Sequence, residues 1–184
     1  MDKRVMGIDA GLTTGCCVME GDPWRVIYTD VLATKKESKK RGIYVTDDDM
    51  RRIKELLEFM YGIYVEYQPA LCIAELAMGG AKDSNAAKGM AISKTVVTAF
   101  AWAMDLPILR VNPDDIKKCL GGSKSASKVV IETAVTKQFP YLMRRWGSKS
   151  ATSGFRGDFE HVADAIGAVI TSEDDAMVKI VRGS

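Results

Sequence analysis

The sequence predicts an α/β domain built on a five-stranded mixed sheet that is flanked by helices. Three strand-like runs follow one another within residues 5–32 and are separated only by turn residues, which indicates an antiparallel meander. Two later apolar runs, 71–76 and 108–111, alternate with helical patterns and indicate two parallel strands. With 184 residues and 47% hydrophobic content, the chain can build one core, so we expect a single domain over residues 1–184.

The meander begins with a strand over residues 5–9, in which side chains alternate between two faces. Residues 11–15, Gly-Leu-Thr-Thr-Gly, form a turn, and residues 16–19 form the second strand. The sequence Gly-Asp-Pro at 21–23 is a strong turn signal, and the third strand follows over residues 25–32.

A polar and basic loop over residues 33–43 leads into the first helix. Thr46 is expected to cap this helix, because acidic residues follow in its first turn, and Gln68-Pro69 ends it. Its apolar residues recur at helical spacing: Met50, Ile53, Leu56, Leu57 and Met60. Residues 71–76 then form an apolar strand that we expect to be buried.

The rest of the chain is mostly helical. Gly79-Gly80 breaks the strand, an Ala-rich helix covers 84–104, and a short strand follows at 108–111. The later boundaries follow from proline, glycine and serine: a helix from Asn112-Pro113 to Gly121-Gly122, another from Ser125 or Ser127 to near Pro140, and a Gly/Ser-rich loop over 148–158. The last helix begins near Asp158 and has a regular apolar face: Val162, Ala165, Ile166 and Val169.

Cysteine usage and hydropathy exclude several classes of protein. The four cysteines, Cys16, Cys17, Cys72 and Cys119, form no CxxC pair, and adjacent Cys16 and Cys17 would point to opposite faces of a strand. We therefore expect buried reduced thiols, not a zinc site or disulfides. No run of about 18 apolar residues is present, and the amino terminus does not resemble a signal peptide. We expect a cytoplasmic protein without membrane contacts, from a bacterial cell or a phage-infected host.

Basic residues gather in one segment, although the net charge is only +2. Between residues 117 and 157 the only acidic residue is Glu132, and nine residues are basic: Lys117, Lys118, Lys124, Lys128, Lys137, Arg144, Arg145, Lys149 and Arg156. A second basic cluster comprises Lys35, Lys36, Lys39, Lys40 and Arg41. Such blocks are typical of polyanion binding, because neutralised phosphates release counterions, and also of an ordinary solvated surface.

Three carboxylates fall where burial makes them costly. Asp9 ends the first strand, Glu75 ends a buried strand, and Asp164 lies on the apolar last helix, three residues after His161. If the two strands are neighbours, Asp9 and Glu75 meet, and the i, i+3 spacing puts His161 and Asp164 on one helix face. Each residue has an ordinary alternative as a turn-stabilising, ion-paired or interfacial group.

A cluster of three carboxylates and one imidazole suits Mg²⁺, which prefers oxygen ligands and keeps waters that substrate phosphates can replace. The chain has a single histidine, so any metal chemistry must rest mainly on carboxylates. Two ions held in this way activate a water and stabilise the leaving oxygen of a phosphodiester. The cluster therefore indicates phosphodiester chemistry on a nucleic acid held by the basic block.

Three blocks taken together resemble the RuvC family of Holliday-junction resolvases, whose fold is RNase H-like. Residues 6–15, Met-Gly-Ile-Asp-Ala-Gly-Leu-Thr-Thr-Gly, are similar to the family's opening pattern, with Ala10 where proline is usual. Residues 69–75 are similar to the block whose strand ends in a catalytic glutamate, and residues 161–165 to the block that begins the last helix. The segment from Asn112 through residues 117–128 also resembles the one that grips DNA in that family.

The resemblance implies a structure-selective endonuclease that cuts Holliday junctions or other branched DNA by a two-metal-ion mechanism. It implies catalysis and binding of two Mg²⁺ or Mn²⁺ ions by Asp9, Glu75, His161 and Asp164, and phosphate contacts by Lys117, Lys118, Lys124 and Lys128. Glu160 ranks below these residues, because a neighbouring helix position points about 100° away. The resemblance also implies a homodimer formed through the helix at 84–104.

The sequence departs from the family at two positions. His161 stands where many bacterial members have aspartate, and Met78 stands where they have an aromatic wedge. An apolar methionine can still insert between bases, but flaps and forks become candidate substrates beside four-way junctions. Two other functions stay open: an actin-like or sugar-kinase-like ATPase, suggested by the turn after Asp9, and a non-catalytic DNA-binding module of the same fold.

Overall fold

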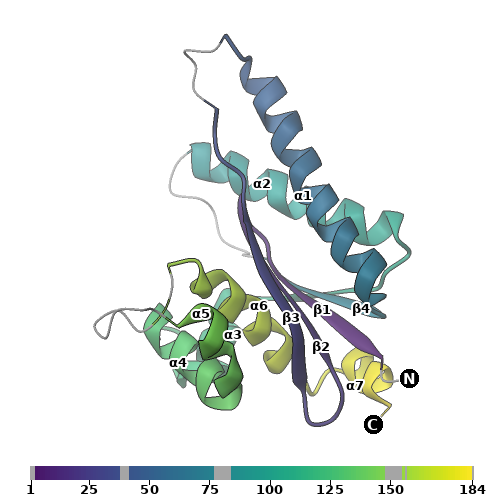
Figure 1. The fold of residues 1–184 in the computed structure, drawn as a ribbon, viewed down its shortest axis with the longest axis vertical. Coiled ribbons are helices and arrows are strands. Elements are labelled where there is room, and N and C mark those ends of the chain that lie inside the picture. The colour runs from purple at the N-terminus through teal and green to yellow at the C-terminus, as the bar shows by residue number, and fades with distance from the viewer. Residues whose placement is uncertain (1–2, 38–41, 77–83, 148–154, 156, 184) are drawn as a thin grey trace.

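The five strands form one mixed sheet in the order β3-β2-β1-β4-β5 (Figure 1). The computed structural model describes residues 3–37, 42–76, 84–147, 155 and 157–183. The strands are β1 (Arg4–Asp9), β2 (Thr13–Glu20), β3 (Arg25–Ala33), β4 (Leu71–Glu75) and β5 (Ile108–Val111). β1 to β3 form the antiparallel meander, whereas β4 and β5 are parallel to β1. The predicted mixed sheet is confirmed, with β1 at its centre.

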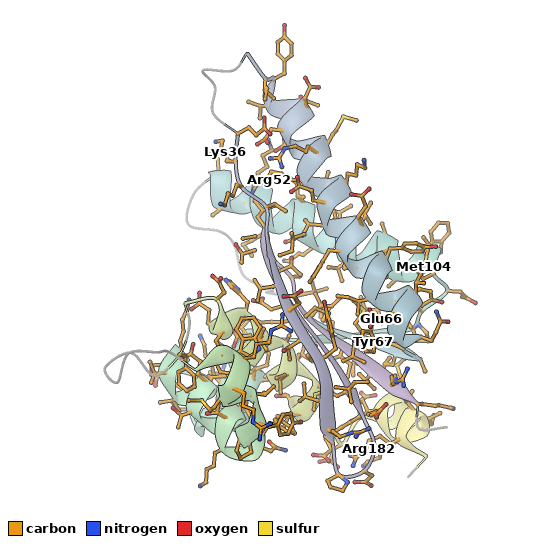
Figure 2. All side chains as sticks on the ribbon, viewed as in Figure 1. Lys36, Arg52, Glu66, Tyr67, Met104 and Arg182 are labelled. Atoms are coloured by element: carbon orange, nitrogen blue, oxygen red, sulfur yellow. The ribbon has the colours of Figure 1, made fainter. Side chains whose placement is uncertain are left out.

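Helices cover both faces of this sheet (Figures 1 and 2). One face carries α1 (Val45–Tyr67) and α2 (Ser84–Ala103), and the other carries α6 (Phe159–Thr171), which packs on β1 and β2. The remaining segments are α3 (Pro113–Gly121), α4 (Lys128–Gln138), the 3₁₀ helix η2 (Pro140–Leu142), α5 (Met143–Trp146) and α7 (Ala176–Arg182). α3 and α4 pack on α6, so the basic segment lies on the same side of the sheet as the last long helix.

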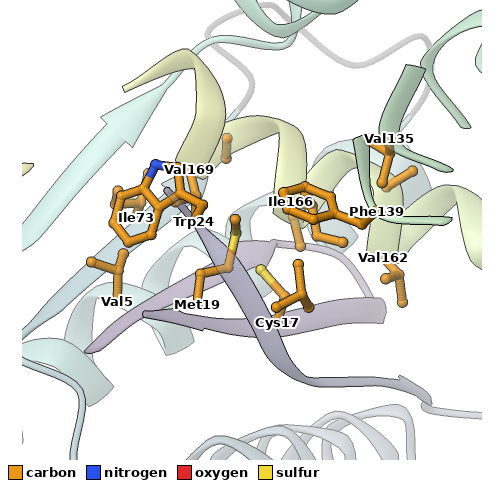
Figure 3. Close-up of a cluster of buried hydrophobic side chains, with 14 of the residues drawn as sticks. Val5, Cys17, Met19, Trp24, Ile73, Val135, Phe139, Val162, Ile166 and Val169 are labelled. Atoms are coloured by element: carbon orange, nitrogen blue, oxygen red, sulfur yellow. The ribbon is translucent and has the colours of Figure 1, made fainter. Parts of the chain in front are cut away.

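Alternating side chains divide the interior into two apolar cores. On one face, Val5 of β1 and Ile73 of β4 pack with the residues of α6: Val162, Ile166 and Val169 (Figure 3). On the other face, Met6 and Ile8 pack against α1 and α2. Each fully buried side chain of this size contributes about 1.5–3 kcal/mol, so both layers are firmly attached to β1.

Two glycines allow α6 to lie directly on the sheet. A Cβ atom on Gly7 of β1 would come within 2.4 Å of the Ala165 carbonyl oxygen, and one on Gly15 of β2 within 2.1 Å of the His161 carbonyl oxygen. Any side chain at these positions would collide with the helix backbone. The missing side chains therefore set the distance between the start of α6 and the ends of β1 and β2.

Several details differ from the sequence-based expectations. α1 begins at Val45 with Tyr44 as its N-cap, so the predicted cap at Thr46 is wrong. Cys16, Cys17 and Cys72 are buried free thiols, with the first two in opposite cores, but Cys119 on α3 is exposed, which corrects the expectation of buried thiols. α5, η2 and α7 were not predicted. Within the described ranges, no helix is both long enough and apolar enough to cross a membrane.

Candidate active site at the strand ends

The parallel pairing of β1 and β4 places two of the predicted carboxylates side by side. Asp9 and Glu75 are direct register partners at the last positions of the two strands. Neighbouring strands lie about 4.8 Å apart, and side chains at alternate positions share a face. Asp9 and Glu75 are thus on the face of Val5 and Ile73, the one covered by α6. The predicted meeting of these two residues is found in the structure.

α6 supplies the other two predicted residues. His161 lies over Gly15, which is the β2 register partner of Asp9. The Nδ1 atom of His161 is 2.7 Å from Oδ2 of Asp9, within hydrogen-bond distance. One turn along the helix, Asp164 lines a pocket of about 300 Å³ together with Glu75. All four predicted residues therefore surround one edge of the sheet.

Burial and mutual repulsion perturb the acids of this cluster. Burial raises the pKa of Glu75 to about 8, with the negative charges of Asp9 and Asp164 adding to the effect. Burial also raises the pKa of Asp164 to about 7, with the charge of Asp9 as the next cause. The hydrogen bond to Asp9 raises the pKa of His161. A cluster of groups with shifted pKa values is typical of functional sites.

Glu160 lies closer to the cluster than its helix position suggested. Its Oε1 atom is 3.6 Å from Nε2 of His161, and its Oε2 atom pairs with Lys128 at the start of α4. The side chain of a glutamate is long enough to reach back along the helix surface, which an angular argument from the backbone does not consider. His161 therefore lies between two carboxylates, Asp9 and Glu160.

The donor chemistry of the cluster fits a divalent cation, although its side chains are not arranged as a finished ligand set. Within the part of the chain that the structure describes, no three His, Cys, Asp or Glu side chains already surround one ion position. Asp9 is hydrogen-bonded to His161 instead. However, the buried Oε2 atom of Glu75 has no hydrogen-bond partner among the described residues, and a buried carboxylate oxygen is costly to leave unpaired. A hard cation near Glu75, Asp9 and Asp164 would satisfy this oxygen.

The raised pKa of Glu75 predicts how the stability of the metal-free protein depends on pH. The folded state holds this proton more tightly than the unfolded chain, so the stabilisation is complete below pH 4.5 and is lost as pH rises through about 8. In EDTA, we expect the melting temperature to fall over this interval. The melting temperature of Glu75→Gln should fall less steeply with pH, because the glutamine side chain has no titrating proton.

Thermal denaturation from pH 5 to pH 8.5 measures this difference. Glu58→Gln on the exposed side of α1 is the control, and its melting temperature should depend on pH as that of the wild type does. Adding Mn²⁺ should raise the melting temperature more at pH 8 than at pH 6, because metal ligands must be deprotonated. Equal slopes for wild type and Glu75→Gln would show that the Glu75 proton is not linked to folding.

The predicted DNA-binding lysines divide into two pairs. Lys117 and Lys128 line the same pocket as Glu75 and Asp164. Lys118 pairs with Asp115 at 3.8 Å, and Lys124 pairs with Asp114 at 3.2 Å, both outside that pocket. The predicted wedge Met78 lies outside the described residues, as do most of the loop over 148–158 and part of the loop over 33–43.

Three solved structures resemble this chain over nearly its whole length. The Thermus thermophilus RuvC structure has a TM-score of 0.66 at 16% identity, and the match covers 98% of this chain and 96% of that one. T. thermophilus RuvC in complex with Holliday junction substrate has a TM-score of 0.65 at 16% identity, covering 92% and 91%. The yeast mitochondrial Holliday junction resolvase Ydc2 has a TM-score of 0.64 at 15% identity, covering 98% and 82%.

By sequence, no protein-family model and no curated protein matches the chain. The structural likeness is nevertheless continuous from the meander to the last long helix, as the coverage shows. The chain therefore has the fold of RuvC, and the RNase H-like architecture predicted from its sequence is confirmed.

Proposed function

We propose that this chain is an endonuclease that depends on divalent metal ions and cuts branched DNA. The observation that carries the proposal is the convergence of Asp9, Glu75, His161 and Asp164 at one edge of the sheet. One buried carboxylate oxygen of this cluster, on Glu75, has no hydrogen-bond partner in the described part of the chain. Two of the structures that share its fold are described as RuvC and one as a Holliday junction resolvase. One of these RuvC structures is a complex with a Holliday junction substrate.

Each residue of the site has a role that follows from its position. Asp9, Glu75, His161 and Asp164 would hold two Mg²⁺ or Mn²⁺ ions, because one Mg²⁺ usually takes only one or two carboxylates from a protein. When bound, such ions supply Lewis-acid polarisation of the phosphate and a more acidic water. His161 is oriented by Asp9, and Lys117 and Lys128 extend the site with positive charge that would contact DNA phosphates.

Cleavage of a panel of synthetic DNAs tests this proposal. Four-way, three-way, flap and fork substrates with equal arms should be nicked in Mg²⁺ or Mn²⁺ and left intact in EDTA. The four-way junction is the expected best substrate, with flaps and forks as further substrates. Binding of junctions without cleavage in any metal would instead identify a non-catalytic DNA-binding module, and hydrolysis of ATP would favour the ATPase alternative.

We also propose that the enzyme is a homodimer joined through α2. Trp102 on this helix is 86% exposed, which is unusual for a large aromatic side chain. A separate apolar pocket of about 430 Å³ lies between α1 and α2, with Tyr61, Phe100 and Met104 in its wall. Sedimentation equilibrium distinguishes a dimer from a monomer of 20.1 kDa.

Lys128→Ala is expected to weaken binding of a four-way junction and to lower the salt dependence of binding. One fewer phosphate contact should reduce the slope of log K against log salt by about one. Fluorescence anisotropy in EDTA, between about 50 and 200 mM salt, measures this slope without cleavage. Lys137→Ala, at the far end of the same helix, is the matched control and should leave the slope unchanged. Identical slopes for both variants would remove Lys128 from the DNA-binding surface.

A further inference from the structure

A second pocket opens at the same edge of the sheet, next to the face that carries α1 and α2. It has a volume of about 380 Å³, and its wall includes Leu12, Lys36, Arg52 and Lys88. Lys36 follows the end of β3 and Arg52 belongs to α1, and Figure 2 shows both near the start of α2. None of the residues placed in the acidic site lines this pocket.

Arg52 is fixed in the wall of this pocket by its neighbours. Its Nε atom donates to Oγ1 of Thr34 at 3.0 Å, and its Nη2 atom donates to the Thr34 carbonyl oxygen at 3.1 Å. Thr34 is itself buried, and both its backbone N–H and its hydroxyl donate to the carbonyl oxygen of Leu12, at 2.9 and 2.7 Å. The guanidinium is therefore held in one orientation relative to the turn that follows Asp9.

The three acids that line the pocket form ion pairs with other cations. Arg51 pairs with Asp48 and Glu37 and also with Glu55, and Lys88 pairs with Asp49. Within the described ranges, Lys36 and Arg52 make no ion pair. An oriented guanidinium beside a free ammonium group matches the geometry and charge of a phosphate.

The pocket is close enough to the acidic site for one DNA strand to reach both. Leu12 lines the pocket and is three residues from Asp9, which limits the separation of their Cα atoms to about 11 Å. One strand of duplex DNA advances about 3.4 Å per nucleotide. A strand whose scissile phosphate lies at Asp9 would therefore reach the Leu12 wall of the pocket within about three nucleotides.

We propose that Lys36 and Arg52 bind a backbone phosphate of the DNA whose scissile bond lies at the acidic site. The inference rests on the proposed function and adds a second contact, on the other side of the sheet edge from Lys117 and Lys128. It also gives a role to the described part of the basic cluster that follows β3. DNA would be held on both sides of the edge at which Asp9 and Glu75 lie.

Salt-dependent binding of a four-way junction in EDTA tests this contact. Lys36→Ala should weaken binding severalfold and lower the slope of log K against log salt by about one. Lys36 is exposed, so its replacement should leave the melting temperature unchanged. Lys54→Ala is the matched control, because Lys54 is an exposed lysine on the same helix as Arg52 and pairs with Glu58. The salt slope of this variant should equal that of the wild type. Arg52→Ala should give a loss of slope similar to that of Lys36→Ala, even if losing the bonds to Thr34 also lowers its stability.

An unchanged slope in Lys36→Ala, at an unchanged melting temperature, would overturn the inference. The cleavage assay separates this failure from that of the proposed function. If the wild type cuts junctions and Lys36→Ala has the wild-type salt slope, only the second phosphate contact is disproved. If the wild type never cuts DNA but Lys36→Ala lowers the salt slope, the nuclease assignment is disproved and the phosphate contact is supported.

Discussion

Asp9→Asn and Glu75→Gln are each expected to reduce junction cleavage by on the order of 10³-fold or more. Both changes remove a negative oxygen from the position where a divalent cation would be held, and the polarisation it supplies amounts to several kcal/mol of transition-state stabilisation. Both replacements are close in shape to the native residues, so the fold should persist.

Single-turnover cleavage in Mn²⁺ and junction binding in EDTA together measure this effect. Binding should stay within about twofold of the wild type, because neither residue contributes a positive charge to the DNA. Glu58→Gln, an exposed acid on α1, should cut and bind as the wild type does. Full cleavage by Glu75→Gln would remove that residue from the metal site. Loss of binding in both variants would mean that the cluster supports the DNA-binding surface and not the chemistry.

The proximity of Asp9 and Glu75 could be predicted from sequence because it depends on local rules. Strand alternation gives the face of each side chain, and two parallel neighbours end at the same edge. The position of His161 and Asp164 on one helix face follows from helix periodicity in the same way. What brings the two pairs together is the absence of side chains at Gly7 and Gly15, and a sequence does not show which helix will lie over a glycine.

The basic residues show where sequence reasoning was incomplete. Lys118 and Lys124 belong to a strongly basic segment, but their side chains pair with Asp115 and Asp114 at the start of α3. Those acids lie just before the segment in which the charges were counted. The pairing of Lys128 with Glu160 joins two helices and depends on tertiary packing, so periodicity alone could not predict it. Segments shorter than two helical turns, such as α5 and η2, contain too few residues to show a period.

Gly15→Ala should reduce cleavage by roughly a hundredfold, although Gly15 carries no functional group. The added Cβ would lie 2.1 Å from the His161 carbonyl oxygen, so the start of α6 must move away from β2. Overpacking of this kind costs about 1–3 kcal/mol of stability. A displacement of about 1 Å at a catalytic group lowers rates by about 10²-fold, and this shift acts directly on His161.

The single histidine of the chain allows this movement to be observed apart from activity. The hydrogen bond to Asp9 raises the pKa of His161, so lengthening that bond should lower the pKa towards the ordinary value for histidine, as NMR titration of the imidazole protons would show. Gly62→Ala is the matched control, because a Cβ at this position in α1 meets no atom within 4 Å. It should stabilise the helix by about 0.5–1 kcal/mol and leave cleavage unchanged. A Gly15→Ala protein with normal cleavage and an unshifted His161 titration would show that contact between α6 and β2 does not position the site.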